Sequence, residues 1–151
     1  QEIQRLIGRS MRAIVDLEKL NKHSITIDCD VLQADGGTRT ASITGAYISL
    51  CLLLKEMKDN NRLTENPIVD SISAISVGII GDKVCTDLNY EEDSTAVVDM
   101  NFVITGRGGI VEVQGTAEGG TFSKVQLDQM YEFASFACNQ LKKIQNKILE
   151  G

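Results

Sequence analysis

Two pairs of strand-like segments, each pair joined by a glycine turn, constrain the fold of this chain most. Residues 69–90 predict two strands that turn at Gly81 and Asp82. Residues 96–119 predict two more strands, which are joined across residues 106–109. Because such short turns join neighbouring strands, we expect this region of the chain to form a sheet.

Helical patterns flank these strands. Apolar residues recur with helical spacing from Ile3 to Val15, and a second helix is expected over about residues 38–58. A closing amphipathic helix is expected from about Lys124 to Leu149. With 42% hydrophobic residues in 151, the chain is long enough to bury a core. The order of these elements predicts a single α+β domain over residues 1–151.

A strand and a glycine turn precede the second helix. Ile25, Ile27, Cys29 and Val31 alternate with polar residues, which predicts a strand over residues 25–31. The turn that follows, Gly36-Gly37, allows positive φ and close backbone approach.

Thr38 is a candidate cap for the second helix, whose first N–H groups and partial positive charge favour an anion. Arg39 adds a planar cation that fits phosphate oxygens. From these residues alone, the turn is either an anion site or an ordinary helix cap. It lacks the Lys-Ser/Thr of a P-loop and the GxGxxG of a dinucleotide turn, which disfavours nucleotide hydrolysis and NAD chemistry.

The composition narrows the class of function further. A net charge of −6 disfavours nucleic-acid binding over the whole surface, so contact with RNA would need a local patch or another chain. The only histidine, His23, lies in a polar turn, which disfavours histidine-dependent catalytic triads. No segment is long and apolar enough to predict a membrane span.

The cysteines indicate the compartment. The four cysteines lack the CxxC spacing of zinc and redox sites, and three of them lie in apolar surroundings: Cys29, Cys51 and Cys138. We expect these three to be buried thiols in the reducing cytoplasm.

The first helix carries an arginine face and begins without a start signal. Arg5, Arg9 and Arg12 fall on one face, which is either solvated or in contact with phosphates or a neighbouring subunit. There is no initiator Met, and helical periodicity begins at the first residues. We therefore expect this sequence to be a fragment.

Several segments together resemble the ribonuclease PH family of bacterial tRNA-trimming exoribonucleases. They are EIQRLIGRSMRAIVDL, IDCDVLQADGGTRTASITGA, SVGII, LNYEEDSTAVVDMN and VEVQGTAEG, in the family's order from Gln1 to about Gly120. The resemblance implies the ribonuclease PH fold, with a part like domain 2 of ribosomal protein S5 and an exoribonuclease C-terminal part. That fold has a mixed sheet with flanking helices, and polynucleotide phosphorylase and exosome ring subunits share it.

The resemblance also implies an activity, partners and site residues. Members cleave RNA 3′ ends with inorganic phosphate, release nucleoside diphosphates and process tRNA precursors and rRNA as a homo-oligomer, a hexameric ring. The positions that match the phosphate-binding motif are Gly37, Thr38 and Arg39. The positions that match the catalytic, Mg²⁺-binding aspartates are Asp93 and Asp99, and Asn101 is expected to support the metal. Val97 departs from the family, where glutamate is common, but it is not a catalytic position.

The family's second phosphate-binding arginine lies upstream of EIQRL, in an N-terminal half that this sequence does not include. We therefore expect these residues alone to be inactive. The main alternative is a non-catalytic subunit of an exosome-like ring that binds RNA or acts as a scaffold. Such subunits typically lose the arginine or the aspartates, whereas Arg39, Asp93 and Asp99 are all present.

The aspartate roles require a particular backbone path. A straight strand from residue 93 to residue 99 would separate the two carboxylates by roughly 20 Å, too far for one Mg²⁺. We therefore expect Asp93–Val98 to fold back as a turn or loop, with the regular strand beginning near Asp99.

Overall fold

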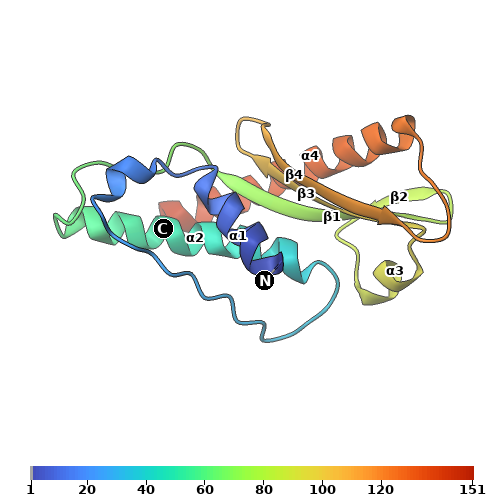
Figure 1. Cartoon of the computed structure of the whole chain (residues 1–151), viewed down its shortest axis with the longest axis horizontal. Helices are drawn as coiled ribbons and strands as arrows, with labels where there is room; N and C mark the ends of the chain where they lie inside the picture. The colour runs from blue at the N-terminus through green and yellow to red at the C-terminus, as the bar shows by residue number, and fades with distance from the viewer. Residues whose placement is uncertain (1) are drawn as a thin grey trace.

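The computed structural model describes residues 2–151 and has helices packed around one sheet (Figure 1). The elements are α1 (Glu2–Arg12), the 3₁₀ helix η1 (Leu17–Leu20), α2 (Thr38–Asp59), β1 (Ile72–Ile80), β2 (Lys83–Thr86), α3 (Tyr90–Thr95), β3 (Val98–Thr105), β4 (Ile110–Ala117) and α4 (Lys124–Glu150). The α+β class expected from the sequence is confirmed. No helix within these residues has the length and apolar character that crossing a membrane requires.

The first helix is shorter than the sequence pattern predicts. It ends at Arg12, whereas the apolar spacing continues to Val15. Val15 instead forms an isolated antiparallel bridge with Ile68, and the Val69 N–H donates to the carbonyl of Ile14 at 2.9 Å. These bonds to a distant segment replace the next helical turn.

The four strands form one sheet in the order β2-β1-β3-β4. Both predicted strand pairs are confirmed, and Gly81 has a φ of 59° in the turn between β1 and β2. Every neighbouring pair is antiparallel, so the expectation of a mixed sheet is wrong for the described residues. Strands β2 and β3 run in the same direction on either side of β1, so the connection through α3 returns the chain to the end of the sheet at which β2 began.

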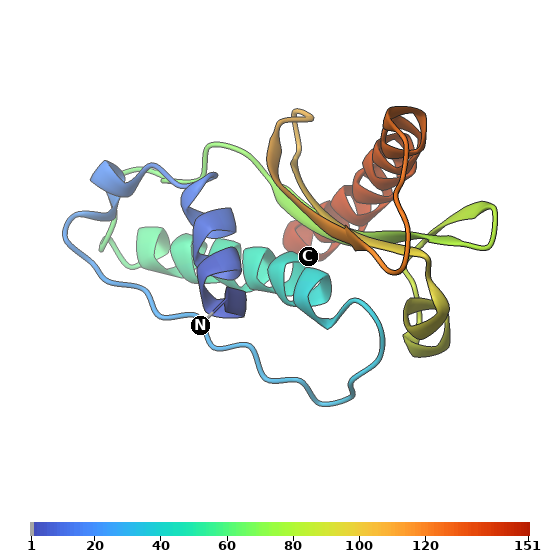
Figure 2. The same cartoon turned by 45° about the vertical axis from the view of Figure 1, so that its right-hand side comes forward.

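Helix α4 covers one face of the sheet (Figure 2). Strand residues at every second position point towards it, because side chains alternate between the two faces of a sheet. Phe102 on β3 and Met130 and Ala134 on α4 are fully buried in this core. The opposite face of the sheet is therefore free to carry polar groups.

Helices α1 and α2 form a second core with the beginning of β1 (Figure 1). There β1 extends beyond the end of β2. The backbone N–H and C=O groups on that edge of β1 therefore need other hydrogen-bond partners. The Thr44 hydroxyl lies 3.2 Å from the Ala74 nitrogen and 3.3 Å from its carbonyl oxygen, and it bonds to both. Gln145 Nε2 donates to the Ile72 carbonyl at 2.9 Å. These bonds fix α2 and α4 against the unpaired part of β1.

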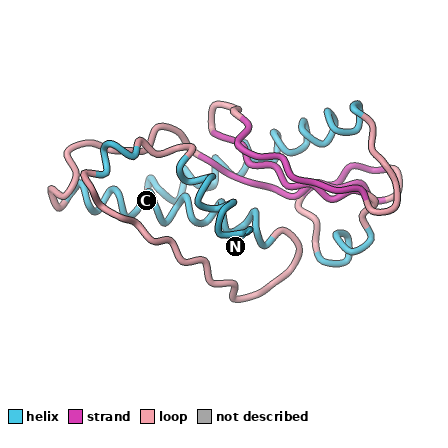
Figure 3. Tube along the Cα trace, in the orientation of Figure 1, coloured by secondary structure: helices cyan, strands magenta, loops and turns pink. Residues whose placement is uncertain are grey.

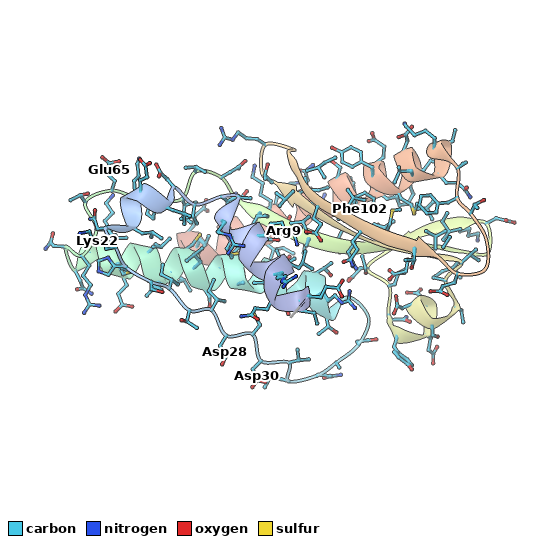
Figure 4. All side chains as sticks on the ribbon, in the orientation of Figure 1. Arg9, Lys22, Asp28, Asp30, Glu65 and Phe102 are labelled. Atoms are coloured by element: carbon cyan, nitrogen blue, oxygen red, sulfur yellow. The ribbon has the colours of Figure 1, made fainter. Side chains whose placement is uncertain are left out.

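Residues 25–31 do not form a strand, so that prediction is wrong. The segment from η1 to α2 is drawn as loop throughout (Figure 3). Its burial alternates only in part as expected: Ile25, Ile27 and Cys29 are half-buried against the helical core, while Asp28 and Asp30 are exposed (Figure 4). Val31, the last residue of the predicted alternation, is exposed. A strand also requires a partner for its backbone, and none pairs with this segment within residues 2–151.

The prediction that three cysteines are buried is confirmed for one of them, and the histidine lies in a polar turn as expected. Cys138 is buried as expected, whereas Cys29 and Cys51 are only half-buried, and all four cysteines are free thiols. Burial raises the pKa of the Cys51 and Cys138 thiols. His23 is exposed, with its Nδ1 2.7 Å from the carbonyl oxygen of Leu20.

Candidate active site

The sheet face opposite α4 carries two rows of small and polar residues across three strands. The pairing register aligns Ser76 with Asn101 and Asn101 with Gln114. The next row aligns Gly78 with Asp99 and Asp99 with Thr116. Residues directly opposite one another point to the same face, so each row forms one patch. Gly78 has no side chain, and the Leu88 side chain packs in the space above it.

The first turn of α2 lies against this face. Gly37 is the N-cap, with a φ of 71°. An ideal Cβ on Gly37 would lie 3.3 Å from the Ser76 hydroxyl, so the turn approaches β1 closely. The two predicted site residues Thr38 and Arg39 are the first positions of the helix.

The N-terminus of α2 has no side-chain cap, so the expectation that Thr38 caps it is wrong. The Thr38 hydroxyl instead donates to the carbonyl of Asp35 at 3.0 Å. Within the described residues, no hydrogen bond reaches the backbone N–H groups of Thr38, Arg39 and Thr40. Unpaired N–H groups at a helix N-terminus favour an anion.

Arg39 is the cation nearest this open helix end. Its side chain is 44% exposed, and its guanidinium lies 4.0 Å from Glu2 Oε1. The same Glu2 oxygen accepts a hydrogen bond from Gln114 Nε2 at 2.6 Å. Arg39 is thus held loosely, beside the polar rows and still accessible to solvent.

Asp99 connects the polar rows to the other predicted site residues. The half-buried position of its carboxyl is the main cause that raises its pKa. The negative charge of Asp93 raises this pKa further, while the positive charge of Arg39 opposes the shift. Asp93 and Arg39 therefore both lie within electrostatic reach of Asp99.

Asp93 reaches this neighbourhood because the chain folds back before β3. Residues Tyr90–Thr95 form α3, and regular strand begins at Val98, so the straight-strand geometry is excluded. The expected turn is a short helix with a capping box: the Asn89 side chain accepts from the Glu92 N–H at 2.9 Å, and the Glu92 carboxylate accepts from the Asn89 N–H at 3.0 Å. Asp93 is exposed on this helix.

The donor set of the site is a pair of carboxylates. No cluster of three or more histidine, cysteine, aspartate or glutamate side chains suited to a metal occurs in residues 2–151. Mg²⁺ needs fewer protein ligands, because it keeps several waters and is often held by one or two carboxylates. The negative charge of Asp93 raises the pKa of Asp99, so the two carboxylates are near enough to attract one hard cation.

Two polar neighbours of the site were not identified from the sequence. Ser76 lies inside the apolar run ISAISVGII, where a single serine is easily taken for filler. Its hydroxyl accepts a hydrogen bond from the Leu88 N–H at 3.2 Å. Gln114 lies inside the segment VEVQGTAEG, which belongs to the family resemblance, but only the strand register places it beside Asn101. Strict alternation along β1 could have assigned Ser76 to the polar face.

The arginine face of the first helix has a partner for one of its residues. Arg9 forms an ion pair with Glu112 on β4 at 3.2 Å (Figure 4). This contact holds α1 beside β4. The pair is partly exposed, so it contributes little stability by itself.

Solved structures of other proteins have this fold. The structure is similar to rice (Oryza sativa) Rrp46, with a TM-score of 0.72, 16% identity and coverage of 99% of this chain and 65% of that chain. It is also similar to the Archaeoglobus fulgidus exosome with RNA bound to the active site, with a TM-score of 0.67, 22% identity and coverage of 94% and 59%. The chain therefore shares the fold of these structures.

Sequence comparisons identify the family. Residues 1–55 match the model of the 3′ exoribonuclease family, domain 1, and residues 70–136 match that of domain 2. Ribonuclease PH of Tropheryma whipplei, from strains Twist and TW08/27, is 54% identical over 99% of this chain. This chain spans 60% of the length of these curated relatives. The chain belongs to the 3′ exoribonuclease family.

Proposed function

We propose that this protein is a phosphate-dependent 3′→5′ exoribonuclease that trims tRNA precursor 3′ ends and releases nucleoside diphosphates. One observation carries the proposal: the uncapped N-terminus of α2 lies against the sheet face that bears Asp99, and the charges of Arg39 and Asp93 both act on that carboxyl. The 54% identity to ribonuclease PH supports the same activity. Arg39, Asp93 and Asp99 occur together, which favours an enzyme over a non-catalytic ring subunit.

Inorganic phosphate would bind at the start of α2. The free N–H groups of Thr38 and Arg39 point out of the helix end, where the helix dipole favours an anion. The Arg39 guanidinium would add charge-assisted hydrogen bonds and orient one phosphate oxygen. Gly37 has no side chain, so the anion can approach the backbone.

The chemical step would exchange a phosphodiester bond for a phosphoanhydride bond. An oxygen of the bound phosphate attacks the terminal phosphorus of the RNA, and the bond from this phosphorus to the 3′ oxygen of the preceding nucleotide breaks. That 3′ oxygen takes up a proton, and the terminal nucleotide leaves as a diphosphate. The raised pKa of Asp99 favours its protonated form, which would donate this proton, a role that typically contributes 10²–10⁴-fold. Only the ionised form of Asp99 would join Asp93 as a ligand of a cation.

A divalent cation would complete the charge balance. Asp93 and Asp99 would hold Mg²⁺, which when bound offsets the negative charge of the attacking and departing groups. Asp93 is exposed, so water can complete the coordination. Asn101 lies two residues after Asp99 on β3, so both side chains point to the same face of the sheet. Asn101 would orient the carboxylate oxygens of Asp99.

The partners would be tRNA precursor 3′ ends and further copies of the chain in a hexameric ring. Support comes from the family and from the likeness in fold to the archaeal exosome core, with a TM-score of 0.66. The free thiols fit a cytoplasmic location.

The test is an assay of the purified full-length protein on a tRNA precursor with a short 3′ extension. The assay contains Mg²⁺ and is run with and without phosphate. Chromatography of the products should show nucleoside diphosphates that form only when phosphate is present. Nucleoside monophosphates formed without phosphate would indicate hydrolysis and contradict the proposal. Failure to shorten the RNA would favour the non-catalytic alternative.

A further inference from the structure

Two loops that are more than fifty residues apart in the sequence meet beside the candidate site. The Asp35 side chain accepts a hydrogen bond from the Tyr90 N–H at 2.6 Å. The same oxygen, Oδ1, accepts from the Gly36 N–H at 2.8 Å. One carboxylate oxygen thus joins the turn before α2 to the first residue of α3.

The bond to Tyr90 fills a position that the cap of α3 leaves open. The capping box of α3 satisfies the N–H groups of Asn89 and Glu92. Tyr90 is the first helical residue, and its N–H has no partner inside the helix. Asp35 supplies that partner from another part of the chain, which ties the orientation of α3 to the turn.

Gly36 allows the two backbones to touch. An ideal Cβ at this position would lie 1.9 Å from the Leu88 carbonyl oxygen and 2.8 Å from the Asn89 carbonyl carbon. Gly36 is not among the glycines with positive φ, so close approach, rather than backbone conformation, requires the glycine.

The α3 side of this contact is anchored to the sheet beneath the site. Leu88 is 1% exposed, and its N–H donates to the Ser76 hydroxyl at 3.2 Å. An ideal Cβ on Gly78 would lie 2.6 Å from Leu88 Cδ1, so the leucine side chain occupies the space above that glycine. Gly78 pairs with Asp99 across the strands. The contact therefore has a rigid base next to the carboxylates.

We propose that Asp35 and Gly36 are positioning residues that hold the phosphate-binding turn and the carboxylate helix α3 in one fixed arrangement. The turn leads directly into Arg39, and α3 carries Asp93, so the contact sets where the phosphate lies relative to the metal-binding carboxylates. This inference rests on the proposed function for its catalytic consequence. The coupling of the two loops can be measured without it.

The first test measures the contact itself. Hydrogen exchange with mass spectrometry of the full-length protein should show faster exchange at the start of α3 in Asp35→Ala than in the wild type. Asp35→Asn should retain most of the protection, because its amide oxygen still accepts a hydrogen bond. Unchanged exchange in Asp35→Ala would overturn the proposal, whether or not the protein degrades RNA.

The second test measures the catalytic consequence through kcat and the KM for RNA. Misplacing a catalytic group by about 1 Å can reduce rates on the order of 10²-fold, so we expect Gly36→Ala and Asp35→Ala to lower kcat by roughly 10- to 100-fold. The KM for RNA should stay within about twofold of the wild-type value, because its remote contacts are untouched. Asp35→Asn should retain at least about half of the wild-type kcat.

Gly45→Ala, on helix α2, is the matched control for Gly36→Ala in the turn before this helix. Nothing lies within 4 Å of an ideal Cβ at Gly45, so this change adds a methyl group without contact. It should leave kcat and hydrogen exchange unchanged. A normal kcat in Gly36→Ala, or equal losses in Asp35→Asn and Asp35→Ala, would overturn the positioning role. If Asp35→Ala does not fold, the comparisons of Asp35→Asn with wild type and of Gly36→Ala with Gly45→Ala still decide the outcome.

A wild-type protein without phosphorolysis but with Asp35-dependent protection of α3 would reject the proposed function and keep the contact. Phosphorolysis that is unaffected by Gly36→Ala would keep the proposed function and reject the positioning role. The two failures are therefore distinguishable.

Discussion

Helices α2 and α4 begin in opposite ways. The N-terminus of α4 is closed by a capping box, in which Ser123 Oγ accepts from the Gln126 N–H at 3.2 Å and Gln126 Oε1 accepts from the Ser123 N–H at 2.8 Å. Its first cation, Lys124, is paired with Asp128 at 2.6 Å. Helix α2 begins at Gly37 without a side-chain cap, and Arg39 has only a 4.0 Å contact to Glu2.

The difference separates a helix end that serves the fold from one that can serve a ligand. A side-chain cap satisfies N–H groups within the protein and stabilises the helix, typically by about 1 kcal/mol. At α2 these groups stay available, so part of the stability is given up unless an anion binds. Four predictions test this comparison, from the largest effect to the smallest.

Asp99→Asn, on β3 beside the open N-terminus of α2, should cause the largest loss of activity. Removing the proposed proton donor should lower kcat on the order of 10²–10⁴-fold with the fold preserved, as checked by circular dichroism and steady-state kinetics. Asp128→Asn is the matched change at the α4 end and should leave kcat unchanged, because this exposed carboxylate only pairs with Lys124. Normal activity in Asp99→Asn would refute the shared carboxylate site.

Arg39→Ala should weaken phosphate far more than RNA. Loss of a charge-assisted hydrogen bond should cost roughly 1.5–3 kcal/mol, which raises the KM for phosphate by about 10- to 150-fold. The control Lys124→Ala removes the first-turn cation of α4 and should leave this KM unchanged. Equal weakening of phosphate and RNA by Arg39→Ala would reject Arg39 as a phosphate ligand.

Ser123→Ala should affect stability and not phosphate. Loss of the capping bond should lower the free energy of unfolding by about 1 kcal/mol, measured by urea denaturation. The KM for phosphate should equal that of the wild type, because the closed helix end takes no part in the site. A changed KM would show that the two helix ends are not separate in function.

Asp99→Asn should also raise stability slightly at neutral pH. Burial and Asp93 raise the pKa of Asp99 in the folded protein above its ordinary value of 3.8. The folded state therefore binds the proton more tightly than the unfolded state, and stability falls as pH rises through the folded pKa. Asparagine removes this loss, so the melting temperature of the variant should exceed that of the wild type at pH 7. The difference should disappear as pH falls below 3.8, and a difference that does not depend on pH would contradict this cause.

Local patterns predicted most of the fold. The two glycine turns and the alternation around them identified all four strands, and α2 and α4 begin and end within one residue of expectation. The prediction failed for residues 25–31, because alternation reports which side chains face a core but not whether a backbone partner exists. It also failed for Thr38, whose hydroxyl bonds back to Asp35 instead of capping the helix.

The candidate site divides in the same way. The chemical types of Arg39, Asp93 and Asp99 are visible in the sequence, and the resemblance assigns their roles, which stay predictions. Their nearness is a property of the tertiary structure, because it depends on α3 folding back and on α2 meeting β1. The contact between Asp35 and Tyr90 had no sequence signal, since fifty-four residues separate them.

Local sequence patterns are enough to specify the helices, the hairpins and the residue types that can bind phosphate and a cation. These depend on interactions within a few residues, such as turn conformation and side-chain periodicity. The tertiary structure decided which helix end stays open, which strand-like segment lacks a partner, and how the turn and α3 are joined. Those outcomes depend on which distant backbone groups find one another, because a polar group that pairs across the fold is no longer available for a local partner or a ligand.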